Sequence, residues 1–300
     1  MVRRADNDTG KVAVPDVTVQ SADRAAAAGR HDPVPSQGDA LRLLARKVWR
    51  AVRPLLAVMI LWEIIGRILG ASALLLPPLL DIGEAMLDGF ASGILFQHIG
   101  VTLFRLFAGF LLGGTLGIIF GLISGRVKVI ADWTVPLCAL FLPIPSLAFV
   151  PLYILWFGLG NLPVIILVAV ASSMPVFMNS YTGTLTVEPV QVHAAQSMGA
   201  TGRALFWKVV LPASLPYVIA GVRVGFARGW RAVIAGEFVA ATGFGLGWFI
   251  FTSRAFLQTA NVLVGIILIG VVGLIVEKVL WETIERRTVV KWGMVEEAVR

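Results

Sequence analysis

Long apolar stretches, separated by short polar or basic segments, constrain this chain more than any other feature of its sequence. These stretches fall near residues 54–69, 99–123, 130–157, 163–181, 214–240 and 262–280. At ~1.5 Å of rise per residue, helices of such lengths are suited to cross a bilayer. A backbone inside lipid must satisfy its own hydrogen bonds, so each stretch is expected to be helical. The sequence therefore predicts an all-α, polytopic membrane protein with about six transmembrane helices.

Composition and charge agree with this class. Hydrophobic residues make up 57% of the 300 residues, and the single cysteine, Cys138, excludes a disulfide within the chain. A net charge of +7 can indicate binding to nucleic acid, but here the basic residues flank the apolar stretches. This is the positive-inside pattern of membrane proteins, and it predicts that both termini are cytoplasmic. The three histidines are too far apart in sequence to indicate a metal motif.

The distribution of polar residues predicts four regions. Residues 1–40 lack apolar periodicity and are expected to form a disordered cytoplasmic tail. Residues 41–98 should comprise a basic lead-in, the first transmembrane helix and an external amphipathic helix at 81–98. Residues 99–282 should form the core domain, with a cytoplasmic loop at 183–212, and residues 283–300 a cytoplasmic C-terminal tail.

Two spacings predict contacts within and between helices. Glu63 and Arg67 are four residues apart, on one helix face, and are expected to form a structural ion pair. A ridge of glycines four residues apart predicts close packing of the second span against another helix. The ridge consists of Gly109, Gly113, Gly117 and Gly121. Arg105, early in the same span, is expected to snorkel to the membrane interface, with contact to substrate as the alternative.

Prolines and glycines predict where the helices are interrupted. The third span contains four prolines, which should bend or break it, and broken helices line pathways more often than they face lipid. They are Pro136, Pro143, Pro145 and Pro151. The glycine-rich stretch 242–257 is expected to be an outer loop or re-entrant segment. It is not a phosphate-binding loop, since no lysine follows at the required position.

A mostly polar or small-residue segment at 192–212 separates two of the later apolar stretches. It predicts a helix at 192–198, a break at Gly199 and a second short helix at 200–210 that ends at Pro212. Glycine ends a helix at little cost because it tolerates positive φ, and proline cannot continue one. A helix–glycine–helix outside the bilayer has a suitable shape for docking into a groove on another protein.

This segment resembles the coupling loop of the membrane subunits of ATP-driven, ABC-type importers. The signature of that loop is Glu-Ala-Ala, three residues, Gly, nine residues, and then Ile-x-Leu-Pro. The matching positions are Ala194, Ala195, Gly199, Leu211 and Pro212, with Val209 in place of isoleucine and His193 in place of glutamate. The stretch FLPIPSLAFVPLYILWFGLG at 141–160 resembles that of the sulfonate, nitrate and taurine branch of these permeases. The resemblance covers about two thirds of the chain or more.

The resemblance implies a type I ABC importer permease in the cell membrane of a prokaryote. Such a subunit forms the pathway for a small solute, here expected to be an anion such as a sulfonate, taurine or nitrate. It is not an enzyme and holds no cofactor. Its implied partners are two copies of a cytoplasmic ATP-binding subunit, a second permease copy in a homodimer, an extracytoplasmic substrate-binding protein and membrane lipid, with no nucleic acid. The absence of a GxxxxGK[ST] motif agrees, since a separate ATPase must then bind ATP.

Charged residues and prolines at membrane depth are the candidates for the translocation pathway. Arg228 and Arg231 are three apart and share a helix face, which favours attraction of an anion. Pairing with Glu237, with Glu63 or with backbone carbonyls is an equally weighted alternative. Glu237, Pro143 and Pro145 complete the candidate set, whereas Arg223 is expected to contribute to helix packing.

Two other classes of function fit the sequence less well than the importer subunit does. An ATP-independent secondary carrier or channel is the main alternative, but no inverted repeat is detectable and the coupling motif argues against it. A membrane-embedded enzyme would need clustered carboxylates, histidines or a nucleophile at membrane depth. The titratable residues of the predicted spans are mostly arginines, which disfavours such an enzyme.

Overall fold

The computed structural model of this protein describes residues 37–68 and 74–287, and every regular element in these ranges is a helix. The predicted all-α fold is thus confirmed for the described residues. Most of the tail predicted at 1–40, and most of the C-terminal tail predicted at 283–300, lie outside them. The chain forms two units, residues 1–62 and 63–300. The described part of the first unit belongs to α2 (Gln37–Ile68), which contains both the basic lead-in and the predicted first span.

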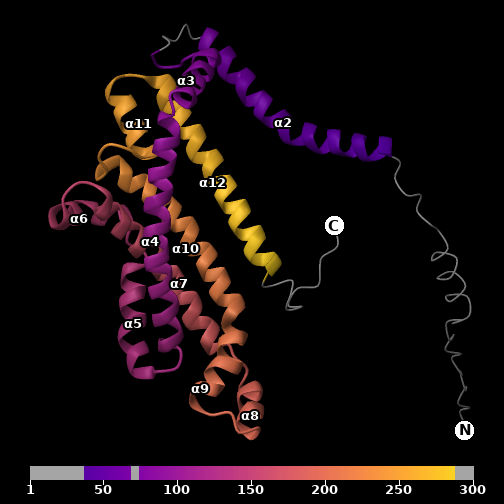
Figure 1. Ribbon diagram of the computed structural model, residues 1–300, viewed down its shortest axis with the longest axis vertical. Helices are drawn as coiled ribbons and strands as arrows, with labels where there is room; N and C mark the ends of the chain where they lie inside the picture. The colour runs from indigo at the N-terminus through magenta and orange to yellow at the C-terminus, as the bar shows by residue number, and fades with distance from the viewer. Residues whose placement is uncertain (1–36, 69–73, 288–300) are drawn as a thin grey trace, which may run out of the picture. The chain divides into compact units, whose positions relative to one another are not determined.

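The second unit is a set of helices of very different lengths (Figure 1). Its elements are α3 (Leu79–Ala91), α4 (Ile94–Ser124), α5 (Lys128–Phe141), the 3₁₀ helix η1 (Ser146–Phe149), α6 (Val150–Phe157), α7 (Asn161–Leu185), α8 (Pro189–Ser197), α9 (Gly202–Leu205), the π-helical η2 (Phe206–Val210), α10 (Leu211–Val239), α11 (Leu246–Ala255) and α12 (Thr259–Arg287).

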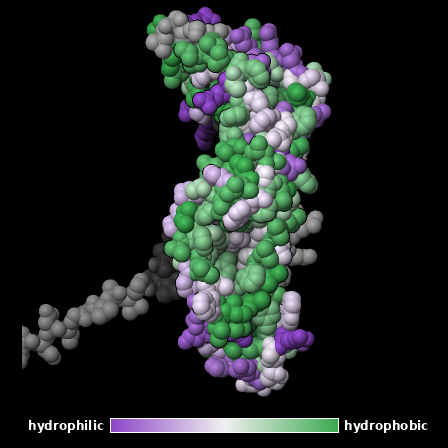
Figure 2. Space-filling view, turned by 90° about the vertical axis from the view of Figure 1, so that its left-hand side faces the viewer, coloured by the Kyte–Doolittle hydropathy of each residue, from purple (hydrophilic) through white to green (hydrophobic). Residues whose placement is uncertain are grey.

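Four stretches among the described residues are long and apolar enough to cross a membrane. They are Ile94–Ser124, Asn161–Leu185, Gly202–Val239 and Thr259–Trp281. The pair formed by α5 and η1–α6 is a fifth if it is counted as one span. Helix α2 is not among these stretches, so the number of six spans stays a prediction. In Figure 2, hydrophobic residues cover much of the visible surface between two more hydrophilic ends.

The predicted glycine ridge is confirmed as the contact between α4 and α7. A Cβ atom at Gly117 would lie 2.6 Å from the carbonyl oxygen of Ser173, and one at Gly121 would lie 2.6 Å from that of Phe177. Such distances are too short for any side chain, so glycine is what lets the two backbones approach. Helix α10 packs against both, and Leu106, Val168, Phe226 and Val233 are part of the common core.

The prolines interrupt the third predicted span, as the sequence indicates. Helix α5 ends at Phe141, and the chain turns through Leu142–Pro145 before η1 and α6 continue at an angle of 96°. We call residues 141–149 the proline elbow. Pro136 lies inside α5, and Pro151 stands in the first turn of α6, where its missing N–H costs nothing.

Two predicted boundaries are wrong. The external helix ends at Ala91 instead of residue 98, because Gly93 takes a left-handed conformation with φ +77° and starts α4, which contains His98. The stretch 242–257 is not a loop throughout, because α11 occupies Leu246–Ala255 and only the residues on either side of it are irregular. The alternative of a re-entrant segment stays a prediction.

Candidate functional site

The proline elbow, α7 and α10 enclose a cavity of about 480 Å³, which we call the arginine pocket. Most of the elbow lines one side of it, including Pro143 and Pro145. Helix α7 contributes Val170, Ala171 and Met174, and helix α10 contributes Arg228, Arg231, Ala232 and Ala235. Four of the five candidate pathway residues therefore border one cavity, although they come from segments about 85 positions apart in the sequence.

Both arginines of the pocket have exposed side chains and neither is neutralised within the described chain. The structure records no hydrogen bond and no ion pair for Arg228 or Arg231 among the described residues. Their two proposed carboxylate partners are engaged elsewhere. Glu63 pairs with Arg67 at 3.0 Å, which confirms that predicted ion pair.

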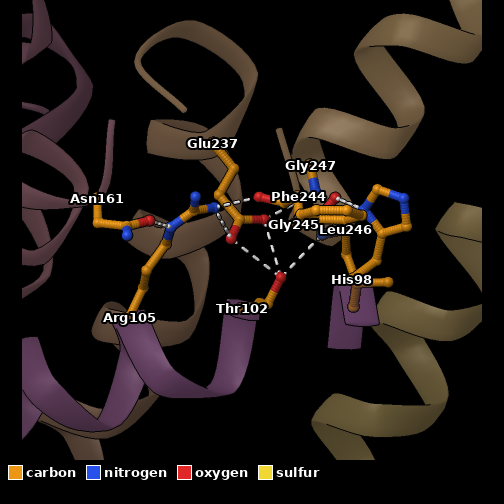
Figure 3. A network of polar contacts seen from close by, with 9 residues as sticks. All are labelled: His98, Thr102, Arg105, Asn161, Glu237, Phe244, Gly245, Leu246 and Gly247. Carbon is orange, nitrogen blue, oxygen red and sulfur yellow. Dashed lines mark hydrogen bonds and ion pairs between the residues drawn. The ribbon is translucent and has the colours of Figure 1, made fainter. Parts of the chain in front are cut away.

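Glu237, the fifth candidate, does not line the arginine pocket. It is fully buried in a separate polar network, where Arg105 Nη1 donates to its Oε1 at 2.8 Å and the Thr102 hydroxyl lies 3.0 Å from both carboxylate oxygens. Figure 3 shows Thr102 and Arg105 on one stretch of α4, both directed at Glu237. Arg105 Nε donates to Asn161 Oδ1 at 2.8 Å, and Nη1 also donates to the carbonyl oxygen of Phe244 at 2.7 Å.

The same network holds the loop between α10 and α11 by its backbone. His98 Nδ1 lies 3.0 Å from the amide nitrogen and 2.9 Å from the carbonyl oxygen of Gly245. The Leu246 amide donates to the Thr102 hydroxyl at 2.8 Å, and the Gly247 amide donates to Glu237 Oε2 at 2.9 Å. Two features of the position of Gly245 require glycine, its backbone conformation and the lack of room for a side chain. Its φ is +138°, and a Cβ would lie 2.6 Å from Arg105 Nη1.

The prediction that Arg105 snorkels to the interface is wrong, since its side chain is 1% exposed. Glu237 supplies the buried counter-charge, and the packed backbone supplies further acceptors, so the charge is compensated inside the protein. The network itself was missed from the sequence. A polar face at His98, Thr102 and Arg105, spaced at four and three residues, was the available signal.

Within the described part of the chain, Arg223 neither lines the arginine pocket nor has a recorded bond to the polar network. Its guanidinium carbon lies 6.0 Å from the ring centroid of Trp281 on α12. This distance is typical of a cation–π contact, and it supports the packing role expected for Arg223. Among the described residues, no group of three or more His, Cys, Asp or Glu side chains could hold a metal ion.

The coupling segment consists of α8, a glycine turn, α9 and η2. Helix α8 ends at Ser197, and Gly199 has φ +85° with open space around its α-carbon, so the glycine break is confirmed. The second helix begins at Gly202 instead of residue 200. It does not stop at Pro212, because this proline stands in the first turn of α10 and the π-helical turn Phe206–Val210 joins α9 to it.

An apolar stripe lies on the exposed face of α8 and its C-terminal end. Val190 is 74% exposed and Met198 is 82% exposed. Ala194 is exposed between them at helical spacing, and we call these three residues the α8 stripe. His193 is exposed beside the stripe, with Nδ1 3.3 Å from Gln196 Oε1. Ala195, in contrast, is buried within the segment.

The remaining residues of the coupling motif lie at the end of the segment. Val209 and Leu211 are half-buried, at the junction where η2 meets α10. They therefore pack where the segment joins α10. The α8 stripe, in contrast, is not covered by any of the described residues and is accessible to a partner protein.

Comparison with known proteins matches residues 113–289 to the family model of the binding-protein-dependent transport system inner membrane component. The chain is 36% identical over 243 residues to the taurine transport system permease protein of Escherichia coli, covering 78% of this chain and 86% of that protein. It is 32% identical over 235 residues to the putative aliphatic sulfonates transport permease protein of Bacillus subtilis, covering 78% and 84%. The bicarbonate transport system permease protein of Synechococcus elongatus is 29% identical over 205 residues, covering 68% and 72%.

Proposed function

This chain belongs to the family of binding-protein-dependent transport system inner membrane components, and from that membership we propose the cargo and the assembly in which it works. The chain is the multi-pass permease subunit of an ATP-driven importer in a prokaryotic inner membrane. The proposed cargo is a small anion such as a sulfonate, taurine or nitrate. Relatives named for taurine, aliphatic sulfonates and bicarbonate support this choice, because each of these solutes carries an oxyanion group, a sulfonate or a bicarbonate.

The proposed assembly contains two copies of this chain, two copies of a cytoplasmic ATP-binding subunit and an extracytoplasmic substrate-binding protein. The permease would carry out no covalent step and hold no cofactor, since ATP would be bound by the partner. Transport would proceed by alternating access as the helices of two permease copies rock against each other. A homodimer is the simplest assembly for a permease subunit of one kind.

The α8 stripe is the single observation that best supports coupling through this segment. Val190 and Met198 are large apolar side chains that remain mostly exposed, on a helix that a glycine turn separates from the span. An apolar helix face of this kind fits a groove on a partner, where apolar anchors are buried. His193, Ala194, Ala195, Gly199, Val209, Leu211 and Pro212 would then be the coupling residues, with Ala194 at the contact and the others shaping or supporting the segment.

Two arginine substitutions on α8, one inside the stripe and one outside it, test whether the stripe binds the ATP-binding subunit. Ala194 belongs to the stripe, and Gln196 is exposed roughly on the opposite side of the same helix. Ala194→Arg should reduce copurification of the ATP-binding subunit at least tenfold, because an unpaired charge would be buried in the contact. Gln196→Arg adds the same charge and should leave copurification unchanged. The measurement is a pull-down of tagged permease from detergent-solubilised membranes, with ATPase activity assayed in the eluate.

Equal loss in both variants would refute docking through the stripe. If the wild-type permease recovers no ATPase under any solubilisation condition, the importer assignment itself fails. An ATP-independent carrier would then be the function to test.

A further inference from the structure

The arginine pocket combines a cavity with two cationic side chains, neither of which has a recorded charge partner among residues 37–68 and 74–287. Arg228 and Arg231 lie within the membrane-spanning stretch Gly202–Val239, and both side chains are exposed. A guanidinium keeps its positive charge in a protein, because it does not give up a proton there. A charge at membrane depth is stable only where protein, water or a bound ion compensates it. The described chain offers no such compensation at these two positions.

We propose that the arginine pocket is a binding site for the anionic group of the cargo, and specifically for a small aliphatic sulfonate. This inference rests on the proposed function of the chain as an importer permease. Two guanidinium groups three residues apart on one helix face present donors in fixed planar forks, which match the oxygens of a sulfonate. A sulfonate would accept hydrogen bonds from these groups and also attract their charge, whereas an uncharged solute offers hydrogen-bond acceptors but no opposite charge.

The rest of the lining fits the aliphatic part of such a solute. Val170, Ala171 and Met174 on α7, with Ala232 and Ala235 on α10, are apolar and mostly small. The volume of about 480 Å³ is within the range of roughly 300–1,000 Å³ that small-molecule sites occupy. A short alkyl chain can therefore lie against α7 while its sulfonate faces Arg228 and Arg231.

One carboxylate, that of Glu277, lines a second cavity that Arg231 also borders. This neighbouring cavity of about 330 Å³ lies between α10 and α12. No ion pair joins Arg231 to Glu277 in the described structure. Arg231 is thus positioned at the boundary of the two cavities and remains available to the arginine pocket.

The test is binding of radiolabelled butane-1-sulfonate to the purified permease–ATPase complex, without the binding protein, measured by equilibrium dialysis. The wild-type complex should bind the probe saturably, and unlabelled butane-1-sulfonate should displace it while the uncharged butane-1-sulfonamide should not. Arg228→Gln and Arg231→Gln should each weaken binding at least tenfold, since each removes one charged donor group. Arg228→Lys and Arg231→Lys should weaken it less, because they keep the charge but lose the planar fork.

Arg223→Gln is the matched control, because it removes the same charge from the same helix outside the pocket. It should bind butane-1-sulfonate as the wild type does. Loss of binding in this variant to the same extent as in Arg228→Gln would mean that only the net charge of α10 matters, and would overturn the proposal.

Two further outcomes would also overturn it. The first is a complex that retains its ATPase but binds no butane-1-sulfonate, which leaves the importer function intact and removes the site. The second is dissociation of the permease dimer in Arg228→Gln and Arg231→Gln, seen by size-exclusion chromatography, which would show that the arginines pair with a second copy. A failure of the proposed function is distinguished from both, because no ATPase would copurify.

Discussion

Arg105 and Glu237 form a buried ion pair in which nearly every polar group has a partner. The guanidinium has one carboxylate, one amide oxygen and one carbonyl oxygen, and the carboxylate also accepts from Thr102 and the Gly247 amide. A buried pair of this kind is not a large net source of stability, because both charges lose their hydration. Its loss is costly for a different reason, since removal of either partner leaves a charge buried alone.

Glu237→Gln should therefore destabilise the protein strongly, by about 3–5 kcal/mol. Arg105→Met should have a similar effect, and the double variant should cost clearly less than the sum of the two. Arg67→Gln is the control, because it breaks an ion pair whose arginine is 79% exposed, and it should cost less than about 1 kcal/mol. Thermal unfolding of the detergent-solubilised protein measures all four variants. An additive double variant would contradict direct coupling between Arg105 and Glu237.

Helices α4 and α7 approach each other through glycine, and this contact is sensitive to a single methyl group. A Cβ at Gly113 would collide with the backbone of Ala169, whereas a Cβ at Gly100 on the same helix would meet no atom within 4 Å. The two positions therefore separate the effect of helix packing from the effect of helix propensity.

Gly113→Ala should lower the unfolding midpoint, because overpacking of a tight contact costs about 1–3 kcal/mol or more. Gly100→Ala should be neutral or stabilising by up to roughly 1 kcal/mol, since alanine favours a helix over glycine. The measurement is the thermal midpoint of each variant in the same detergent. An unchanged midpoint in Gly113→Ala would contradict the close packing of α4 on α7.

The helices that could be predicted from the sequence are those whose signal is local. The glycine spacing predicts that α4 packs closely on another helix but not that this helix is α7. The prolines predict the elbow, and Gly199 predicts the turn in the coupling segment. What the sequence did not reveal depends on tertiary contacts. The burial of Arg105 requires Glu237 more than 130 residues away, and the continuation of α9 into α10 requires a π-helical turn upstream of Pro212.

The candidate pathway residues likewise combine local signals, which the sequence contains, with tertiary contacts, which it does not reveal. Arg228 and Arg231 were identified by their shared helix face, and Pro143 and Pro145 by their power to break a helix. Their common cavity follows only from the packing of the elbow against α10. Glu237 was grouped with them on charge and depth alone, which could not distinguish a cavity from a buried network.

Charge is unevenly distributed between the two ends of the second unit. Asp81, Glu84 and Asp88 lie exposed on α3 at one end, and Arg126 and Lys128 lie at the turn between α4 and α5 at the other, where Figure 1 also places α8 and α9. By the positive-inside rule, the coupling segment is expected in the cytoplasm and the turn between α11 and α12 outside.

Single cysteines in a Cys138→Ala background test this orientation. Phe256 is 76% exposed in the α11–α12 turn and Met198 is 82% exposed in the coupling segment. A membrane-impermeant maleimide added to intact cells (spheroplasts where an outer membrane is present) should label Phe256→Cys and not Met198→Cys, which should react only after permeabilisation. The reverse pattern would mean that the chain is inserted the other way round.

The absence of a stop at Pro212 has a mechanical consequence. From Gly202 to Val239 the chain is one continuous helix of 38 residues, and at ~1.5 Å per residue Gly202 and Arg231 are roughly 40 Å apart along it. The helix thus connects the coupling segment to both guanidinium groups through an unbroken backbone, but two places along it favour bending, the π-helical turn Phe206–Val210 and Pro216. In the proposed importer, a tilt imposed at the coupling end would change the direction in which the two charges face, less whatever is absorbed by bending at these two places.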